Sequence, residues 1–408
     1  NLIMLGGPIS VMVDVIIGFG VKRVTSIPIL DLTTQYESIR ADVEAAALRV
    51  LASGRYIKGT SVETFEQALA HYLNTSHCIA CNSGTDALFL ALRALGIGPG
   101  DEVITTPFTF IATAEMISAV GATPVFVDIE PDTFNLDLNL VPAAITERTR
   151  AIMPVHLFGR PVDMAKVMAI AHTHQLWVIE DCAQAIGATW QGQKVGSMGH
   201  IGCFSFYPTK NLGACGDGGA VTTNDDAIAH KLRVLADHGR TEGYYHEAIG
   251  VNSRLDALQA EILQIKLQHL DQWNAQRTQR AAYYSQHLQP IPNLHPPTHP
   301  SHGASVWNQY TIRVTNGPDD SANPPSASRD RVRAHLQQNG ISTMIYYPLP
   351  LHQQPIYLEQ LPNPKPLPVA ESMVHQVLSL PMFPELTTLQ QDQIIETLHQ
   401  LSHHPPTP

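Results

Sequence analysis

The sequence predicts an α/β fold, in which a mostly parallel sheet lies between helices and a smaller α+β domain follows. From about Val62, short apolar runs alternate with amphipathic stretches, which is typical of strands joined by helical crossovers. The chain has 408 residues. Because a single hydrophobic core stops growing near ~250–300 residues, we expect two domains.

The large domain is expected over residues 27–287. Its first clear helix spans 85–95, with Thr85 as the predicted N-cap. Further helix-like segments lie at 111–120, 138–147 and 162–174. Short β-rich runs lie at 102–106, 123–129, 150–158 and 176–181. Strands 202–206 and 218–224 then follow each other without a long helix between them, so one edge of the sheet should depart from simple alternation.

The small domain is expected over residues 288–408. A long helix from Leu255 to about His287 and the Pro-rich segment LQPIPNLHPPTHPSHG lead into it. It should hold two strands, a helix and two terminal helices, with the strands at 308–314 and 342–347 and the helix near 329–339. Segment 315–330 is poor in apolar residues, which indicates a loose loop.

Composition excludes several classes of protein. The chain is 44% hydrophobic and 15% charged, with a net charge of −11 and no basic run, so we expect no nucleic-acid surface. The apolar stretch at the start carries Asp14 and several glycines and lacks a leading positive charge, which fits neither a membrane span nor a signal peptide. Because the chain begins without Met, we expect residues 1–26 to be an over-extended reading frame or an artefact.

The cysteines indicate a reducing compartment. There are 5, an odd number at irregular spacing, which does not resemble a disulfide framework, so we expect a cytoplasmic protein. Cys78 and Cys81 form a CxxC beside His77, but no second ligand pair completes a zinc site. We therefore expect buried structural thiols and no metal.

Two stretches could bind a charged ligand. NSGTDAL, residues 82–88, runs from a turn directly into a helix, and such a helix start can bind an anion. An ordinary turn capped by Thr85 explains the same residues. VIEDCAQAIGA delivers Asp181 to the carboxyl end of a strand, with Gln184 three residues on, although a helix-capping Asp is the simpler alternative.

The segment FSFYPTKNLGACGDGG places one lysine, Lys210, between an aromatic strand and a run of glycines. The glycines follow the lysine instead of preceding it, so this is not a phosphate-binding loop of the nucleotide hydrolases. The alternative is an imine between Lys210 and pyridoxal 5′-phosphate, which needs a phosphate pocket, a carboxylate for the ring nitrogen and a flat ring for stacking. The turn at 84–85 with Ser205, Asp181, and either Phe108 or Phe110 could supply these.

These motifs, with PVHLFG, NSRLDALQA and YYPLPLHQQP, resemble the DegT-type sugar aminotransferases from Ile27 to the C-terminal helices. The resemblance implies the fold-type-I architecture of pyridoxal phosphate (PLP) enzymes, with a mostly parallel seven-stranded sheet in the large domain. It implies that Lys210 forms the imine and moves the proton, that Asp181 binds the pyridine nitrogen, that Gln184 lies beside the ring oxygen, and that Phe110 stacks on the ring.

The same resemblance assigns Gly84, Thr85 and Ser205 to the phosphate cup. It implies that Asn252 reaches the phosphate of a neighbouring subunit, hence a homodimer with shared active sites. Substrate contacts are expected from Tyr207, Arg254 and His352, although a capping role for Arg254 and a surface position for His352 are alternatives. Val251 and Asn308 depart from the family pattern, where an aromatic and a histidine are usual.

The implied reaction moves the amino group of L-glutamate onto a nucleotide-linked keto-deoxysugar in the synthesis of deoxyamino sugars, such as those of cell-surface polysaccharides. The lysine motif resembles enzymes acting at C3 of a dTDP-3-keto-6-deoxyhexose. Enzymes acting at C4 of a dTDP-, UDP- or GDP-linked 4-keto sugar are the alternative. A dehydratase of this fold should carry histidine in place of Lys210, and a non-catalytic regulatory protein should have lost Lys210 or Asp181.

Overall fold

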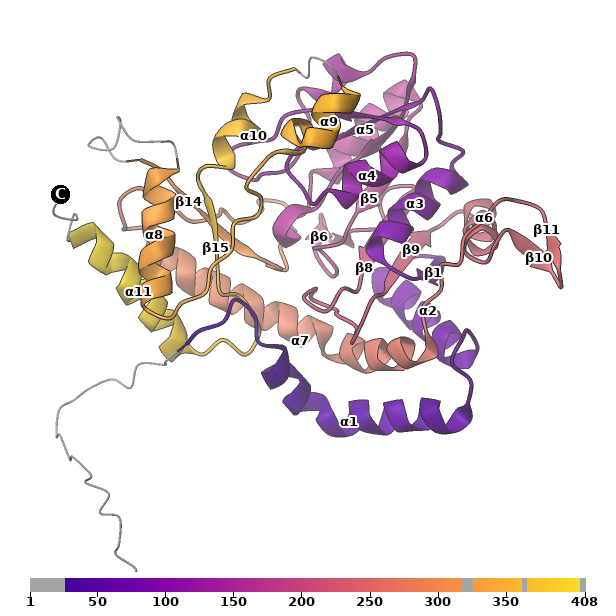
Figure 1. The fold of residues 1–408 in the computed structure, drawn as a ribbon, viewed down its shortest axis with the longest axis horizontal. Helices are drawn as coiled ribbons and strands as arrows, with labels where there is room; N and C mark the ends of the chain where they lie inside the picture. The colour runs from indigo at the N-terminus through magenta and orange to yellow at the C-terminus, as the bar shows by residue number, and fades with distance from the viewer. Residues whose placement is uncertain (1–25, 317–325, 362–364, 404–408) are drawn as a thin grey trace, which may run out of the picture.

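The computed structural model describes residues 26–316, 326–361 and 365–403, and Figure 1 shows how their helices and strands are arranged. The large sheet has seven strands. In spatial order they are β1 (His77–Cys81), β9 (Gly219–Thr223), β8 (Ile201–Ser205), β5 (Trp177–Asp181), β4 (Thr149–Met153), β2 (Glu102–Thr105) and β3 (Thr123–Phe126). Among these seven, β9 alone runs against the others. The predicted sheet and its irregular edge are confirmed.

Helices cover both faces of this sheet. One face packs against α3 (Gly84–Ala94), α4 (Ala112–Ala119) and α6 (Asp226–Ala236). The other packs against α2 (Thr60–Leu73), α5 (Met164–His174) and α7 (Ala257–Leu288). Because successive residues of a strand point to opposite faces, Asp181 lies on the side of α3 and α4, whereas Glu180 lies on the other side.

Some elements carried no strong sequence signal. Helix α1 (Leu32–Ser53) lies alongside α7 in Figure 1, and Asp31 caps it by accepting bonds of 3.0 Å from the N–H groups of Thr33 and Thr34. A hairpin of β10 (Arg240–Glu242) and β11 (Tyr245–His246) projects from the body. A further small sheet joins β13 (Gly303–Ala304), β6 (Thr189–Trp190) and β7 (Gln193–Lys194).

A second core lies around a three-stranded antiparallel sheet of β12 (Leu294–His295), β14 (Tyr310–Val314) and β15 (Val377–Leu380). Helices α8 (Ala327–Gln338) and α11 (Thr388–His403) pack against it, and α9 (Pro355–Gln360) and α10 (Pro368–Met373) are short. The last turns of α7 belong to this core, because Tyr284 is fully buried there and donates a bond of 3.1 Å to the carbonyl of Pro381. A domain boundary at residue 287 stays a prediction.

Three sequence expectations are corrected. Segment 138–147 holds only a short 3₁₀ turn, Val141–Ala144, because Pro142 stands in its first turn and Leu136 pairs with Ile129 just before it. Segment 342–347 is not a strand; only Met344 forms a bridge, with Ser379. Within the expected loose loop, α8 already begins at Ala327, and residues 317–325 lie outside the described residues.

The described helices include none that combines the length and apolarity needed to cross a bilayer. All five cysteines are free thiols. Cys78 and Cys81 are buried in β1, as predicted, and burial raises the pKa of the Cys78 thiol well above its usual value. The first 25 residues, which include most of the predicted extension, lie outside the described part of the chain.

Candidate active site

Four parallel strands deliver the predicted site residues to one edge of the sheet. Strands β1, β2, β5 and β8 all end there, because parallel strands share the direction of their carboxyl ends. The turn after β1 leads directly into Gly84 and Thr85, the first residues of α3, and the loop after β2 carries Phe110. Strand β5 ends at Asp181, and β8 leads through Ser205 to Lys210. Ligands bind at this edge in open α/β sheets.

Asp181 is 4% exposed and lies under α4. Its Oδ2 accepts a hydrogen bond of 2.8 Å from Thr113 Oγ1, and its Oδ1 accepts one of 3.1 Å from the N–H of Ala183. Burial raises the pKa of Asp181, although these hydrogen bonds and the positive charge of Lys210 oppose that rise. No helix follows Asp181, so the alternative role as a helix cap is wrong.

Lys210 lies close enough to Asp181 for each charge to affect the other's pKa. Although part of the lysine surface remains accessible, the surrounding protein lowers the pKa of its amine to about 8, and Asp181 opposes that fall. At pH 7.5 roughly a quarter of such amines are neutral, against about one in a thousand at an ordinary lysine pKa. The fold thus makes the Lys210 amine a competent nucleophile.

The predicted phosphate cup is a close contact between the start of α3 and the end of β8. A Cβ added at Gly84 would lie 2.5 Å from Cβ of Ser205, so only glycine lets the start of α3 approach β8 this closely. Ser83, not Thr85 as predicted, is the N-cap of α3: its Oγ accepts a bond of 3.1 Å from the N–H of Asp86. The N–H groups of Gly84 and Thr85 and the hydroxyl of Thr85 have no partner within the described parts of the chain, so they remain available to an anion.

The two candidate stacking rings occupy different environments. Phe108 is fully buried against Phe134 and Tyr347, at centroid distances of 5.9 and 6.1 Å. Phe110 is 56% exposed just before α4, so its ring has a face available for a ligand. Between Phe108 and Phe110, the geometry therefore favours Phe110, in agreement with the resemblance.

Gln184 is bonded at both ends of its amide. Its Oε1 accepts a bond of 2.6 Å from the N–H of Phe158, and its Nε2 donates one of 3.2 Å to the hydroxyl of Tyr347. The side chain is 8% exposed. These bonds fix the plane of the amide beside Asp181, and the position of Gln184 next to a cofactor ring stays a prediction.

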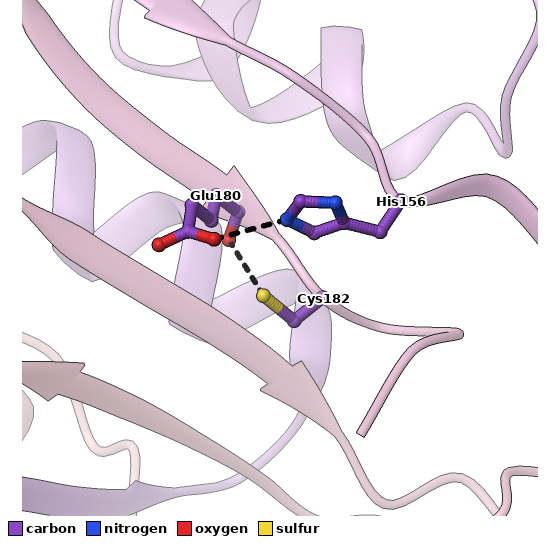
Figure 2. Close-up of side chains that lie close together, drawn as sticks. All are labelled: His156, Glu180 and Cys182. Atoms are coloured by element: carbon purple, nitrogen blue, oxygen red, sulfur yellow. Dashed lines mark hydrogen bonds and ion pairs between the residues drawn. The ribbon is translucent and has the colours of Figure 1, made fainter. Parts of the chain in front are cut away.

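Directly behind Asp181, on the opposite face of the sheet, His156, Glu180 and Cys182 form the buried cluster that Figure 2 shows. His156 Nε2 lies 3.0 Å from Glu180 Oε2, and the Cys182 thiol points to the carbonyl oxygen of Glu180 at 3.6 Å. Three such side chains can be a metal site, so their remaining partners decide their role.

Those partners occupy the carboxylate of Glu180 and both ring nitrogens of His156. The Glu180 carboxylate also accepts backbone N–H bonds of 2.6–3.0 Å from Gly196, Met198 and Gly199. His156 Nδ1 accepts a bond of 3.0 Å from the N–H of Val162, which places the ring proton on Nε2, facing Glu180. The lone pairs of the carboxylate and of the imidazole are therefore already used within the protein. These bonds give the cluster a structural role, and the absence of a metal stays a prediction.

The three predicted substrate residues lie in different surroundings. Tyr207 is 54% exposed on the lysine loop. Arg254 does not cap α7, whose N-cap is Asp256; instead its Nη1 lies 3.3 Å from Asp237 Oδ1, in a cleft of ≈ 180 Å³. His352 is 2% exposed with its Nε2 3.0 Å from Glu371 Oε1, so the surface alternative is wrong. Their contact with a substrate stays a prediction.

The last predicted site residue is Asn252. It is exposed, pairs through its backbone with Asp237, and its side chain has no hydrogen-bond partner within the described parts of the chain. Its alternative role as a helix cap is wrong, since α7 begins later, at Ala257. An exposed, unbonded amide is consistent with the predicted contact to a second subunit.

The sequence did not identify Thr113 or Tyr347 as site residues. Thr113 lies in FTFIATA, in the first turn of α4, where its hydroxyl lies 3.1 Å from that of Thr109. Tyr347 was expected on a strand. Its hydroxyl reaches Gln184 because the chain leaves the small sheet after the bridge between Met344 and Ser379.

The residues present fit PLP. An amine with a lowered pKa, an acid buried opposite it, an exposed ring, and a glycine-lined helix start supply the donors and the space that this cofactor requires. The cradle at Gly84 is the specific observation, because any side chain there would close it.

Comparisons with known proteins agree with this fit to PLP. A model of the "DegT/DnrJ/EryC1/StrS aminotransferase family" matches residues 37–399. The chain is 46% identical to a "dTDP-3-amino-3,4,6-trideoxy-alpha-D-glucose transaminase" of Streptomyces venezuelae, over 92% of this chain and 96% of that protein. It is also 46% identical to a "Pleiotropic regulatory protein" of Geobacillus stearothermophilus, over 93% and 99%.

Solved structures are also similar. The crystal structure of S. venezuelae DesV in complex with a ketimine intermediate has a TM-score of 0.89 and 44% identity, over 94% of this chain and all (100%) of that one. Bacillus subtilis NtdA with bound cofactor PMP has a TM-score of 0.86 and 32% identity, over 94% and 86%.

Proposed function

The chain belongs to the DegT/DnrJ/EryC1/StrS aminotransferase family, and from this premise we propose that it moves the amino group of L-glutamate onto C3 of a dTDP-linked 3-keto-6-deoxyhexose. It is a PLP-dependent aminotransferase, as its family and structural relatives are. The observation that supports the aminotransferase function is that Asp181 is buried near Lys210, whose amine has a lowered pKa.

The chain's own residues orient an acid, hold a proton on the cofactor ring and move a second proton. When bound, the cofactor supplies a carbon that receives the amino group and a ring that accepts electrons. Asp181, oriented by Thr113, holds a proton on the ring nitrogen. With the cofactor bound, Lys210 Nζ, as a neutral amine, would take the Cα proton of the donor and release it again within the site. L-glutamate would give up its amino group, take its keto oxygen from water and leave as 2-oxoglutarate, and the keto-sugar would then take up the amino group and release water.

The choice of C3 is supported by the names of several relatives. They include the transaminase of S. venezuelae, a "dTDP-3-amino-3,6-dideoxy-alpha-D-galactopyranose transaminase" of Aneurinibacillus thermoaerophilus, and a "UDP-N-acetyl-3-dehydro-alpha-D-glucosamine" 3-aminotransferase of Acidithiobacillus ferrooxidans. All three names place the reaction at C3, whereas the nucleotide differs between them. A dTDP-linked sugar is favoured because two of these three carry it.

The test is mass spectrometry of products formed from ¹⁵N-labelled L-glutamate and a panel of dTDP-, UDP- and GDP-linked 3-keto and 4-keto sugars. We expect one labelled amine in a dTDP-linked 3-amino sugar, with its position assigned by NMR. Lys210→Ala should give no labelled sugar. A labelled 4-amino product from a dTDP-, UDP- or GDP-linked sugar would overturn the choice of C3 and leave the aminotransferase in place.

A non-catalytic regulatory role is the second candidate, because one relative bears the name of a regulatory protein. The visible absorbance of the purified protein separates the two functions. An aminotransferase shows a band from cofactor linked to Lys210, and this band decays when L-glutamate is added. A regulatory protein keeps its spectrum unchanged on adding L-glutamate.

The proposal includes a homodimer with shared active sites, acting in the cytoplasm. It is supported by the exposed, unbonded side chain of Asn252 and by five free thiols. Mixing inactive Lys210→Ala and Asn252→Ala subunits tests it. If Asn252 serves the partner's site, mixed dimers regain one intact site and measurable activity. If it serves its own site, the Asn252→Ala subunits stay as impaired in the mixture as they are alone.

A further inference from the structure

A chain of three buried asparagine amides ends at the lysine loop. It starts on α7, where Asn274 Nδ2 donates to the carbonyl of Ile186 at 3.1 Å. Asn211 Nδ2 donates to Asn274 Oδ1 at 2.7 Å, and Asn308 Nδ2 donates to Asn211 Oδ1 at 2.8 Å. Asn274, Asn211 and Asn308 are 8%, 3% and 6% exposed, respectively.

The direction of this chain is fixed by its backbone partners. Asn211 Nδ2 also donates to the carbonyl of Val306 at 2.9 Å, and Asn274 Nδ2 has the carbonyl of Ile186 as its acceptor. Turning any one amide around would set oxygen against oxygen. The first two links therefore force Asn308 to present its Nδ2, and not its Oδ1, to the lysine loop.

Asn308 bonds to the residues on both sides of Lys210. Its Nδ2 donates to Asn211 Oδ1 at 2.8 Å and to the carbonyl of Thr209 at 3.4 Å. Its own Oδ1 is buried and has no donor among the described residues. Because an unpaired buried acceptor costs free energy, an amide is an unfavourable way to fill this space. The bonds that Nδ2 makes to the loop are what offsets the cost.

The backbone of Asn308 is held from the other side. Arg277, 2% exposed on α7, donates to the carbonyls of Trp307 and Met382 at 3.2 and 3.0 Å. A Cβ added at Gly159 would lie 2.9 Å from the backbone nitrogen of Asn308, so the chain here is packed against the loop after β4. The amide thus bonds the lysine loop from a fixed support.

We propose that Asn308 is a positioning residue for Lys210, which acts by holding the backbone at Thr209 and Asn211 so that the amine stays opposite Asp181. The inference rests on the proposed role of Lys210 and adds a residue to it. Asn308 makes no contact with Lys210 itself among the described interactions, so it acts through the loop. Loss of the Asn308 amide should slow the reaction of the Lys210 amine with a carbonyl. The slowing should be greater than a loss of stability alone produces.

The test measures capture of pyridoxal phosphate by cofactor-free protein, followed by the growth of the visible band. Asn308→Asp keeps the shape but replaces the donor by an oxygen, so both loop bonds are lost. Capture should become about tenfold slower, as expected when one or two buried hydrogen bonds are removed. The pH midpoint of the band should also shift. Asn308→Ser, whose hydroxyl is too short to bridge both partners, should show the same effect with less strain.

Thr311→Val is the matched control. It removes another buried hydrogen bond from the same stretch of chain, the one of 2.8 Å between the hydroxyls of Thr311 on β14 and Ser379 on β15, which does not involve the lysine loop. It should lower stability and leave capture unchanged. If the Asn308 variants capture the cofactor as fast as Thr311→Val, or if neither of them folds, Asn308 is a purely structural residue and the inference is wrong.

The wild-type result separates this inference from the proposed function. If the wild-type protein forms no band at Lys210, the proposed function fails and the variants are irrelevant to that failure. If the wild-type band forms and decays with L-glutamate while the Asn308 variants match the control, only the role of Asn308 fails.

Discussion

The hydroxyl of Thr113 donates a 2.8 Å hydrogen bond to Oδ2 of Asp181 beneath helix α4, and both side chains are buried. This bond lowers the pKa of Asp181 against the stronger effect of burial, which raises it. A single hydroxyl therefore helps to keep the acid of the site ionised. Because the pair joins a helix to a strand, its strength depends on how α4 packs on the sheet.

Replacing Thr113 by valine should raise the pKa of Asp181 further. Only the ionised carboxylate can hold a protonated ring nitrogen by charge. As the pH falls, the variant should therefore lose activity at a higher pH than wild type does. We expect a roughly tenfold slower glutamate half-reaction at neutral pH, as for other lost hydrogen bonds to charged groups. The pH profile of that half-reaction measures the shift. An acid limb no different from that of Thr311→Val would contradict the role of Thr113.

Gly84→Ala should close the phosphate cradle. Its Cβ would meet Ser205 Cβ at 2.5 Å and Cα at 3.0 Å, so α3 or β8 must move. We expect affinity for pyridoxal phosphate to fall at least tenfold and the free energy of unfolding to drop by about 1–3 kcal/mol, as for other overpacked sites. Gly98→Ala is the control, since its nearest atom would be a carbonyl oxygen at 3.6 Å. Equal affinities in the two variants would argue against the cradle.

The amine of Lys210 should set the pH dependence of cofactor capture. Its pKa is lowered to about 8, chiefly by burial, and the neutral amine is the reactive form. The capture rate should rise about tenfold per pH unit below 8 and level off above it. Because the negative charge of Asp181 raises the pKa of Lys210, Asp181→Asn should move the midpoint to lower pH. A wild-type rate that still climbs at pH 10 would show that the amine titrates normally.

Glu180→Gln should destabilise the protein without involving a metal. Its carboxylate accepts three backbone N–H bonds and faces His156 Nε2, so an amide would set N–H against N–H. We expect about 2–4 kcal/mol less free energy of unfolding in urea. Glu102→Gln should cost less, because its partner Arg148 is 70% exposed. A chelator should change neither stability nor the visible band; a loss of either would revive the metal-site interpretation.

Local pattern predicted some elements well and others poorly. Strands of the large sheet were found because they are buried on both faces and read as short apolar runs. Helix α1 was missed, although it packs along α7. Its apolar residues are not confined to one face, because Leu48 and Leu51 are exposed, and this weakens the periodic signal of a helix. Segment 342–347 has the composition of a strand. Only Met344 within it pairs with a strand, through Ser379 of β15, and composition alone does not reveal that the pairing stops there.

The sequence by itself determined the sheet, the strand ends at Asp181 and Ser205, the loop that carries Lys210, and the glycine at residue 84 where α3 starts. These follow from apolar runs, strand ends and small residues, all of which are local. Only the tertiary structure decided which groups tune those residues. Thr113 bonds to Asp181, Tyr347 to Gln184, and Asn308 to the lysine loop, across separations of 68, 163 and 97 residues (the last measured to Asn211). Such contacts arise from how helices and strands pack, and no period in the chain encodes them.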